Sequence, residues 1–167
     1  PGPCVAMSSV PPSTTAAAAG AHPAAAEAAT LLGAFTGPVD ATTAAALAAE
    51  LDRVALRRGQ VLFHHGDPGD AVYFVVAGSL RVSLRRDDGR EVRLGQVGPG
   101  ESVGEMALLS GEPRMATVRA EEDSELLRLS KVGYDTLVAR APQALAMFAR
   151  VMAERLARSA RSRQAVA

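Results

Sequence analysis

Three residues in the second half of the chain have the types and spacing best suited to ligand-binding chemistry. Gly104 and Glu105 stand where a short helix is expected to begin, and Arg114 is expected to open a strand. Free backbone amides at the start of a helix attract anions, and a guanidinium can bind two phosphate oxygens at once. Because Glu105 can accept a hydrogen bond from a sugar hydroxyl, this pattern predicts a site for a small phosphate next to a sugar.

The expected surroundings of Arg114 leave two interpretations open. On a strand, Arg114 shares one face with Ala116 and Val118. Burying an arginine among small apolar side chains is costly unless a partner neutralises it. That partner could be Glu105, in an ion pair internal to the protein, or a bound anion. The two interpretations are compatible, because an internal pair can be organised in advance for a ligand.

No catalytic or metal site is expected. Residues 100–104 match the G-x-S-x-G pattern of hydrolases, but that motif needs a strand before it, a long helix after it, and then Asp and His. All three histidines precede Ser102. His64 and His65 are adjacent, so on a strand they point to opposite faces. Because Cys4 lies far from them in the sequence, we expect no metal cluster.

The surrounding sequence predicts many short strands. Glycines recur between short apolar runs, which is typical of a roll or barrel. Residues 80–85 alternate between apolar and polar types, so positions 81, 83 and 85 should face water. Residues 71–77 are nearly all apolar and should be buried on both faces. Asp87-Asp88-Gly89 predicts a hairpin turn, and residues 66–70 predict a tight loop.

Helices are expected on both sides of these strands. Asp40 is a candidate N-cap for a helix that ends near residue 52 and turns Leu47 and Leu51 inward. Residues 131–140 have a helical pattern.

A last helix is expected to begin at Pro142, because proline suits the first helical position. Its apolar stripe comprises Leu145, Phe148, Met152 and Leu156. The same helix carries a series of arginines, which could bind a phosphate backbone but are expected to form a solvated face: Arg150, Arg155, Arg158, Arg161 and Arg163.

Composition sets limits on the class of protein. The chain has 18 basic and 18 acidic residues, so no overall field directs it to nucleic acid or to an anionic membrane. Its single cysteine excludes an intrachain disulfide and suits a reducing compartment. No apolar run is long enough to span a bilayer, and no secretion signal is evident. We expect a cytoplasmic protein, or the cytoplasmic face of a membrane protein if the chain is a fragment.

The N-terminal part differs from the rest in composition. Residues 1–30 are rich in Ala, Pro, Ser and Thr, which predicts a disordered segment or linker. Residues 1–6 could be a cloning remnant before a natural start at Met7, or the whole chain could be part of a longer protein. The folded domain is expected over residues 31–163, with the roll over about 56–130 and C-terminal helices over about 131–163.

The order of residues 100–120 resembles the phosphate-binding cassette of the cyclic nucleotide-binding domain family. The resemblance rests on Gly104-Glu105, Ala107-Leu108 and Arg114-Met115-Ala116-Thr117-Val118. It implies a mainly β fold with flanking helices. In that fold an antiparallel β-roll of the jelly-roll, or double-stranded β-helix, type lies between an N-terminal helix, a short cassette helix and C-terminal helices. It also implies a binding domain rather than an enzyme, with no cofactor.

The resemblance further implies a role for each cassette residue. Arg114 would hold the phosphate oxygens, and the backbone amides of Ala107 and Met115 would complete the cradle. Glu105, helped by the backbone of Gly104, would take the ribose 2′-hydroxyl. The full set of candidate ligand-binding residues is Val103, Gly104, Glu105, Met106, Ala107, Leu108, Arg114, Met115 and Ala116.

The ligand implied is 3′,5′-cyclic AMP, with cyclic GMP as the alternative. Met115 departs from the family pattern, in which Ala, Ser or Thr is usual and members that prefer cGMP tend to carry a hydroxyl. Because a methionine offers guanine no strong donor or acceptor, a preference for cAMP is expected. The simplest alternative for Met115 is that its side chain turns away and packs on the roll.

The expected function is regulatory. The domain would sense a cyclic nucleotide and signal through movement of the last helix, with Phe148 and Met152 as candidates for a lid or for contacts in a homodimer. The sequence most resembles domains attached to bacterial patatin-like phospholipases, so the chain could be the regulatory part of a phospholipase, a channel or a transporter. A transcription factor needs a helix-turn-helix after the last helix, so DNA is not an expected partner. A degenerate roll that no longer binds nucleotide is the remaining alternative.

Overall fold

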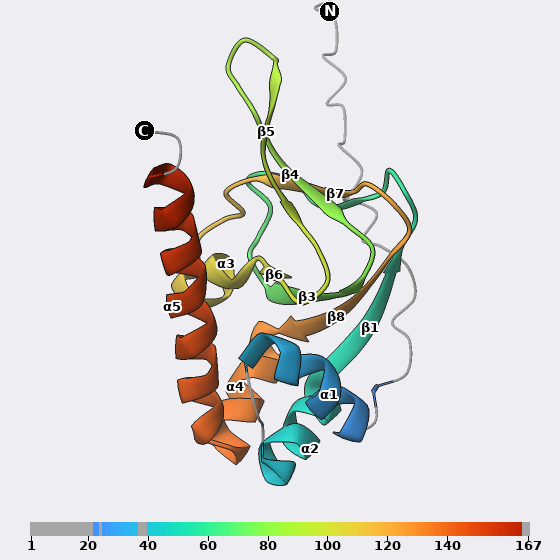
Figure 1. Ribbon diagram of the computed structural model, residues 1–167, viewed down its shortest axis with the longest axis vertical. Helices are drawn as coiled ribbons and strands as arrows, with labels where there is room; N and C mark the ends of the chain where they lie inside the picture. The colour runs from blue at the N-terminus through green and yellow to red at the C-terminus, as the bar shows by residue number, and fades with distance from the viewer. Residues whose placement is uncertain (1–21, 24, 37–39, 165–167) are drawn as a thin grey trace, which may run out of the picture.

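The computed structural model describes residues 22–23, 25–36 and 40–164 of the chain. Two antiparallel four-stranded sheets form the body of the molecule, and helices pack at one end and along one side of it (Figure 1). The sheets do not close into a barrel. The expected class, a mainly β roll with flanking helices, is confirmed.

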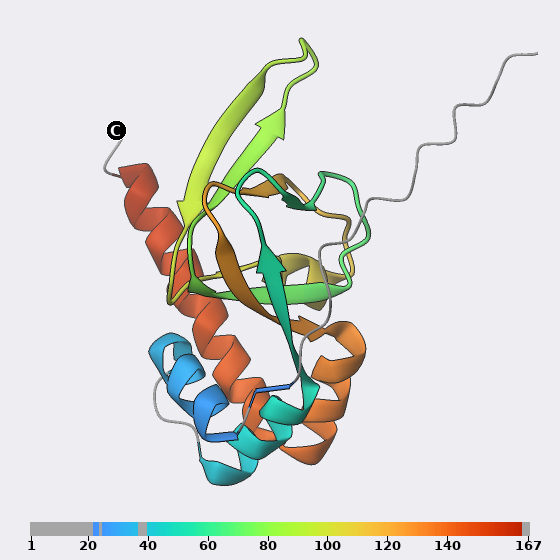
Figure 2. The same cartoon turned by 90° about the vertical axis from the view of Figure 1, so that its right-hand side faces the viewer.

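The two sheets share one apolar core. The first sheet has the strand order β1 (Leu51–Leu56), β8 (Ser124–Ser130), β3 (Ala71–Ala77) and β6 (Ser102–Val103). The second has the order β2 (Val61–Phe63), β7 (Thr117–Ala120), β4 (Leu80–Arg85) and β5 (Glu91–Val97). The core between the sheets takes side chains from both, among them Val75, Leu80, Val118 and Leu126. The hairpin of β4 and β5 extends from the end of the body opposite α1, α2 and α4 (Figure 2).

Strand β3 separates this core from a second one. Its Tyr73 and Val75 lie in the core between the sheets, whereas Val72 and Phe74 lie in a core shared with the helices. The prediction of burial on both faces is confirmed for residues 71–75. The helices are α1 (Ala25–Thr36), α2 (Ala41–Glu50), α3 (Glu105–Ser110), α4 (Lys131–Arg140) and α5 (Gln143–Gln164).

Several local predictions agree with the structure. The carboxylate of Asp40 accepts a hydrogen bond from the amide of Thr43 at 2.9 Å and caps α2. That helix ends at Glu50, and Leu47 and Leu51 are both fully buried, although Leu51 already belongs to β1. The hairpin turn is present as well: Gly89 has a φ of +83°, a conformation that favours glycine.

The N-terminal helix corrects one expectation. Helix α1 begins at Ala25, inside the segment interpreted as a linker, while residues 1–21 lie outside the described part of the chain. Ala28 is fully buried in the core shared with the helices, and Glu27 forms an ion pair with Arg53 of β1. Small side chains let one helix approach another closely, so an alanine such as Ala28 can contribute to the packing of α1.

Two other surface assignments also change. Ser83 was expected to face water but is 1% exposed, and its hydroxyl donates to Glu91 at 2.5 Å. On α5, Phe148 is buried, but Leu145 and Leu156 are 55% and 62% exposed, so the predicted stripe is buried only in part.

Pro142 stands directly before the first residue of the helix rather than within it. Among the described residues, no helix combines the length and apolar character needed to cross a membrane.

Candidate ligand-binding site

The cassette begins with a turn that requires glycine. Strand β6 ends at Val103 and α3 starts at Glu105, so Gly104 alone makes the turn, with a φ of +88°. A Cβ atom at this position would lie 2.4 Å from Nη1 of Arg114 and 3.2 Å from the carbonyl oxygen of Ala71. Gly104 therefore makes room for the guanidinium of Arg114 as well as for the backbone turn.

Arg114 lies inside the roll and is held from several sides. It is only 3% exposed. Its Nη2 donates to the carbonyl of Ala71 at 2.8 Å, and its Nη1 donates to the carbonyl of Gly104 at 3.1 Å. The centre of the guanidinium is 4.1 Å from the centroid of the Phe63 ring, a cation–π contact. These contacts connect the cassette to β2 and β3.

The charge of Arg114 is incompletely compensated. The carboxylate beside it is that of Asp70, with 3.6 Å between Oδ1 and Nη2, and Asp70 is largely exposed. Burial lowers the pKa of Arg114 from its ordinary value, and nearby groups, Tyr73 and Asp70 foremost, oppose that shift. Its Nε is buried and has no hydrogen-bond partner among the described residues. A buried donor without an acceptor costs free energy, and an anion bound here would remove that cost.

Glu105 is the other buried charged residue of the cassette. It is 4% exposed and is the first residue of α3. A carboxylate in the first turn of a helix interacts favourably with the helix dipole. The structure gives Arg114 an ion pair with Asp70, and a pairing of Glu105 with Arg114 stays a prediction.

The other predicted site residues divide into buried and exposed ones. Val103 lies in the core between the sheets, and Leu108 lies in the core shared with the helices. These two can contact a ligand only through their backbone. Met106 and Met115 are 46% and 70% exposed, so Met115 does not pack on the roll as the alternative supposed. Ala116 is half-buried.

A hollow of about 310 Å³ opens beside Arg114. It is lined in part by Phe63, Asp70, Tyr73 and Arg128, none of which the sequence marked as a site residue. The turn-rich loop around Asp70 was the one available signal, because functional residues often lie on such loops. The aromatic residues carried no signal of their own, since on sequence alone they read as core.

The candidate lid residues lie on α5 at the core shared with the helices. Phe148 is 4% exposed, and its ring meets the Tyr134 ring edge-on, with 5.0 Å between centroids. Met152 is half-buried. Further along α5, Arg158 pairs with Glu101 of the loop before β6, at 3.3 Å. The helix thus contacts the segment that leads into the cassette.

Comparison with known proteins supports the family resemblance that the sequence indicated. The model of the cyclic nucleotide-binding domain family matches residues 53–141. "Lysophospholipase nte1" of Aspergillus oryzae is 35% identical over 106 residues, which are 64% of this chain but only 7% of that protein. The chain therefore spans a small part of the curated relatives it matches.

Two solved structures have similar folds. The N-terminal domain of a transcriptional regulator from Streptomyces coelicolor is 34% identical with a TM-score of 0.65, covering 77% of this chain and 90% of that one. The regulatory domain of Toxoplasma gondii PKA, solved with cAMP, is 26% identical with a TM-score of 0.61, covering 68% and 44%. With a family match over more than half of its length, a buried cassette arginine and a shared β-roll, this chain belongs to the cyclic nucleotide-binding domain family.

Proposed function

We propose that this domain binds cAMP, with the cyclic phosphate on Arg114 and the ribose on Glu105. The observation that carries the proposal is the buried guanidinium of Arg114, whose Nε has no acceptor among the described residues. A phosphate oxygen would supply that acceptor and the missing negative charge. The Toxoplasma relative that was solved with cAMP supports this choice of ligand.

The partners of Arg114 suggest how the phosphate would enter. Its two terminal nitrogens donate to the neutral carbonyls of Gly104 and Ala71. A phosphate accepts two parallel hydrogen bonds from a guanidinium and also brings the opposite charge, which a neutral carbonyl does not, so a phosphate can replace at least one carbonyl with a net gain. The amide of Ala107, in α3, and the amide of Met115, in the segment before β7, would complete the cradle. Phe63 would keep the guanidinium plane in place during this exchange.

We further propose that the bound nucleotide signals through α5 to an attached effector. The contact between Arg158 and Glu101 connects this helix to the segment before the cassette, and Phe148 and Met152 lie on the same helix. The chain corresponds to 7% of the Aspergillus lysophospholipase, which favours a regulatory part of a larger phospholipase. The likeness to the N-terminal domain of a Streptomyces transcriptional regulator makes a DNA-binding effector the alternative. In either case the chemistry would belong to the effector.

Calorimetric titration with cAMP and cGMP tests the binding step. Arg114→Ala should weaken cAMP binding ~10²–10³-fold, because the phosphate would lose its buried counter-charge. Arg114→Lys should recover only part of the affinity, since lysine lacks the planar fork. Arg85→Ala removes the same charge from an exposed position on β4 and should bind like the wild type. Unchanged affinity in a folded Arg114→Ala protein would refute the assignment.

A further inference from the structure

A second basic hollow lies on the outer face of the other sheet, away from Arg114. It has a volume of about 380 Å³ and is lined by the arginines Arg58, Arg81, Arg93 and Arg119 together with Glu121. On β7, Val118 and Ala120 are buried in the core between the sheets, so Arg119 between them points outward. We call this hollow the arginine pocket. None of the candidate ligand-binding residues named above lines this pocket.

The strand register concentrates these charges. Arg81 of β4 is paired directly with Arg119 of β7, and like charges directly opposite one another destabilise a sheet. The register of β4 and β5 shifts between Val82 and Ser83. This irregularity puts Arg93 on the same face as Gln96, to which it donates at 3.3 Å. The irregular register thus puts on one face of the sheet arginine side chains that a regular alternation along the strands would have distributed over both faces.

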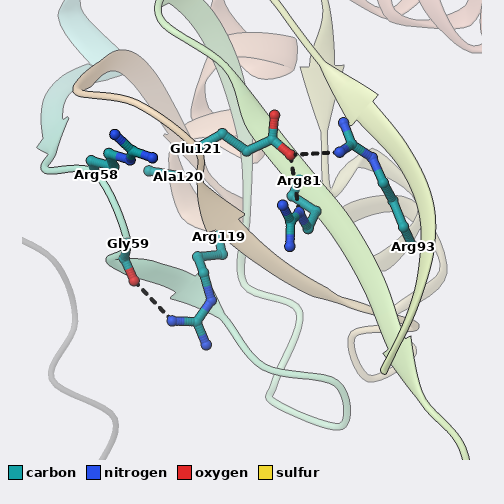
Figure 3. Close-up of a pocket in the computed structure, with 7 residues that line it drawn as sticks. All are labelled: Arg58, Gly59, Arg81, Arg93, Arg119, Ala120 and Glu121. Carbon is teal, nitrogen blue, oxygen red and sulfur yellow. Dashed lines mark hydrogen bonds and ion pairs between the residues drawn. The ribbon is translucent and has the colours of Figure 1, made fainter. Parts of the chain in front are cut away.

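One carboxylate offsets part of this charge. Oε1 of Glu121 lies 3.0 Å from Nε of Arg81 and 3.0 Å from Nη1 of Arg93. The hydrogen bond from Arg81, and then the charge of Arg93, lower the pKa of Glu121, so it is ionised at neutral pH. Figure 3 shows the carboxylate of Glu121 facing both of these arginines, with Arg58 and Arg119 farther from Arg93.

The remaining two arginines carry the excess charge. Arg119 donates to the neutral carbonyl of Gly59 at 2.9 Å. The Arg58 backbone amide donates to Asp123 at 2.8 Å, while its guanidinium has no ion-pair partner among the described residues. The lining of the pocket therefore contains four guanidinium groups and one carboxylate. The formal net charge of the whole chain, by contrast, is +0. This is a local concentration of charge and not a property of the whole surface.

We propose that the arginine pocket binds a compact anion that carries two phosphate groups. Guanidinium groups bind phosphate oxygens in pairs, which selects phosphate over a simple monovalent anion. An excess of three positive charges among the lining residues matches a pyrophosphate or bisphosphate group, and the volume admits a group of that size. Such a group could belong to a free phosphorylated metabolite or to a bisphosphorylated lipid headgroup. The proposal is independent of cyclic nucleotide binding.

Titration with inorganic pyrophosphate tests the pocket. Wild type should bind one equivalent, and the double variant Arg58→Ala/Arg119→Ala should bind at least ~10-fold more weakly, because it removes two cations and leaves the Glu121 cluster intact. The matched control is Arg85→Ala/Arg90→Ala, which removes two exposed arginines outside the pocket and should change affinity less than ~3-fold. Arg119→Lys, which keeps the charge and loses the fork, should show an intermediate loss.

Vesicles distinguish the two sources of the phosphate groups. Phosphatidylcholine vesicles with phosphatidylinositol 4,5-bisphosphate should retain wild type and the control pair, but not the pocket pair, if the headgroup is the ligand. Pyrophosphate binding without vesicle binding identifies a soluble ligand, and both results support the pocket. Equal weakening of pyrophosphate binding in the pocket pair and the control pair would reveal nonspecific attraction and overturn the proposal. The proposal would also be overturned if wild type bound neither pyrophosphate nor the vesicles.

Discussion

Replacing Gly104 by alanine tests whether the cassette depends on the space reserved for Arg114. The new Cβ would lie 2.4 Å from Nη1 of Arg114, so the guanidinium must move and its hydrogen bond to the Gly104 carbonyl must break. A hydrogen bond to a charged group contributes ~1.5–3 kcal/mol. The positive φ of +88° adds ~1–2 kcal/mol for a residue with a Cβ. We therefore expect the free energy of unfolding to fall by ~2.5–5 kcal/mol in urea titrations.

The matched control for this variant is Gly89→Ala. Gly89 also has a positive φ, +83°, but its added Cβ would meet only Nη2 of Arg85, at 3.9 Å. Gly89→Ala should lower the free energy of unfolding by the backbone cost alone, up to ~2 kcal/mol, and leave cAMP affinity unchanged. Gly104→Ala should lose at least ~10-fold in cAMP affinity by calorimetry, because the displaced guanidinium no longer meets the phosphate. If both variants lose equal stability and both keep full cAMP affinity, Gly104 does not reserve space for Arg114.

Four further outcomes are expected. In Glu105→Ala, calorimetry should show weaker cAMP binding and a smaller penalty for 2′-deoxy-cAMP, because the penalty arises from a carboxylate left unpaired; an unchanged penalty would exclude Glu105 as the ribose reader. Met115→Thr should raise relative cGMP affinity by ~1 kcal/mol at most, and a wild type that already prefers cGMP would contradict the reasoning. With cAMP, hydrogen exchange should slow in both the cassette and α5, and Arg158→Ala should reduce the effect in α5; slowing confined to the cassette would mean that α5 is not the output. The hydrogen bonds from Thr43 lower the pKa of Asp40, so the cap stabilises the fold above the ordinary carboxyl pKa, and this stabilisation is lost as the pH falls through the lowered pKa. Asp40→Asn should therefore flatten that part of the curve of stability against pH. An unchanged curve would exclude the cap as the source of the pH dependence.

The sequence predicted the features that depend on local chemistry. The cap at Asp40, the turn at Gly89 and the double burial of β3 each follow from residue types within a few positions of one another. The limits of α4 were predicted to the residue from the helical pattern of residues 131–140, and the structure adds a cap at Ser130 that the sequence analysis did not name. The cassette was recognised in another way, from its own residues and their resemblance to the family pattern.

The features that the sequence did not predict depend on contacts between distant segments. The guanidinium of Arg114 is held by Ala71 and Phe63, which belong to other strands of the roll, and no periodicity identifies such partners. Burial of Ser83 depends on a hydroxyl contact with Glu91 across a hairpin with an irregular register. In helix α1, Ala28 is buried in a core formed with residues of the other helices and of β3 and β8.

The arginine pocket illustrates the same limit at the level of a site. Each of its arginines, taken alone, looks like a solvated strand or loop residue, and the alternation on β4 predicted that for Arg81. Only the register, which pairs Arg81 with Arg119 and turns Arg93 to the same face, makes these residues a cluster. Arg114 and Arg119 differ in the same way: five positions apart in the sequence, one points into the roll and the other out of it. Strand β7 begins at Thr117 and not at Arg114 as the sequence predicted, so Arg114 precedes the strand and Arg119 lies on its outer face. The position in the fold, and not the residue type, decides which anion each arginine can meet.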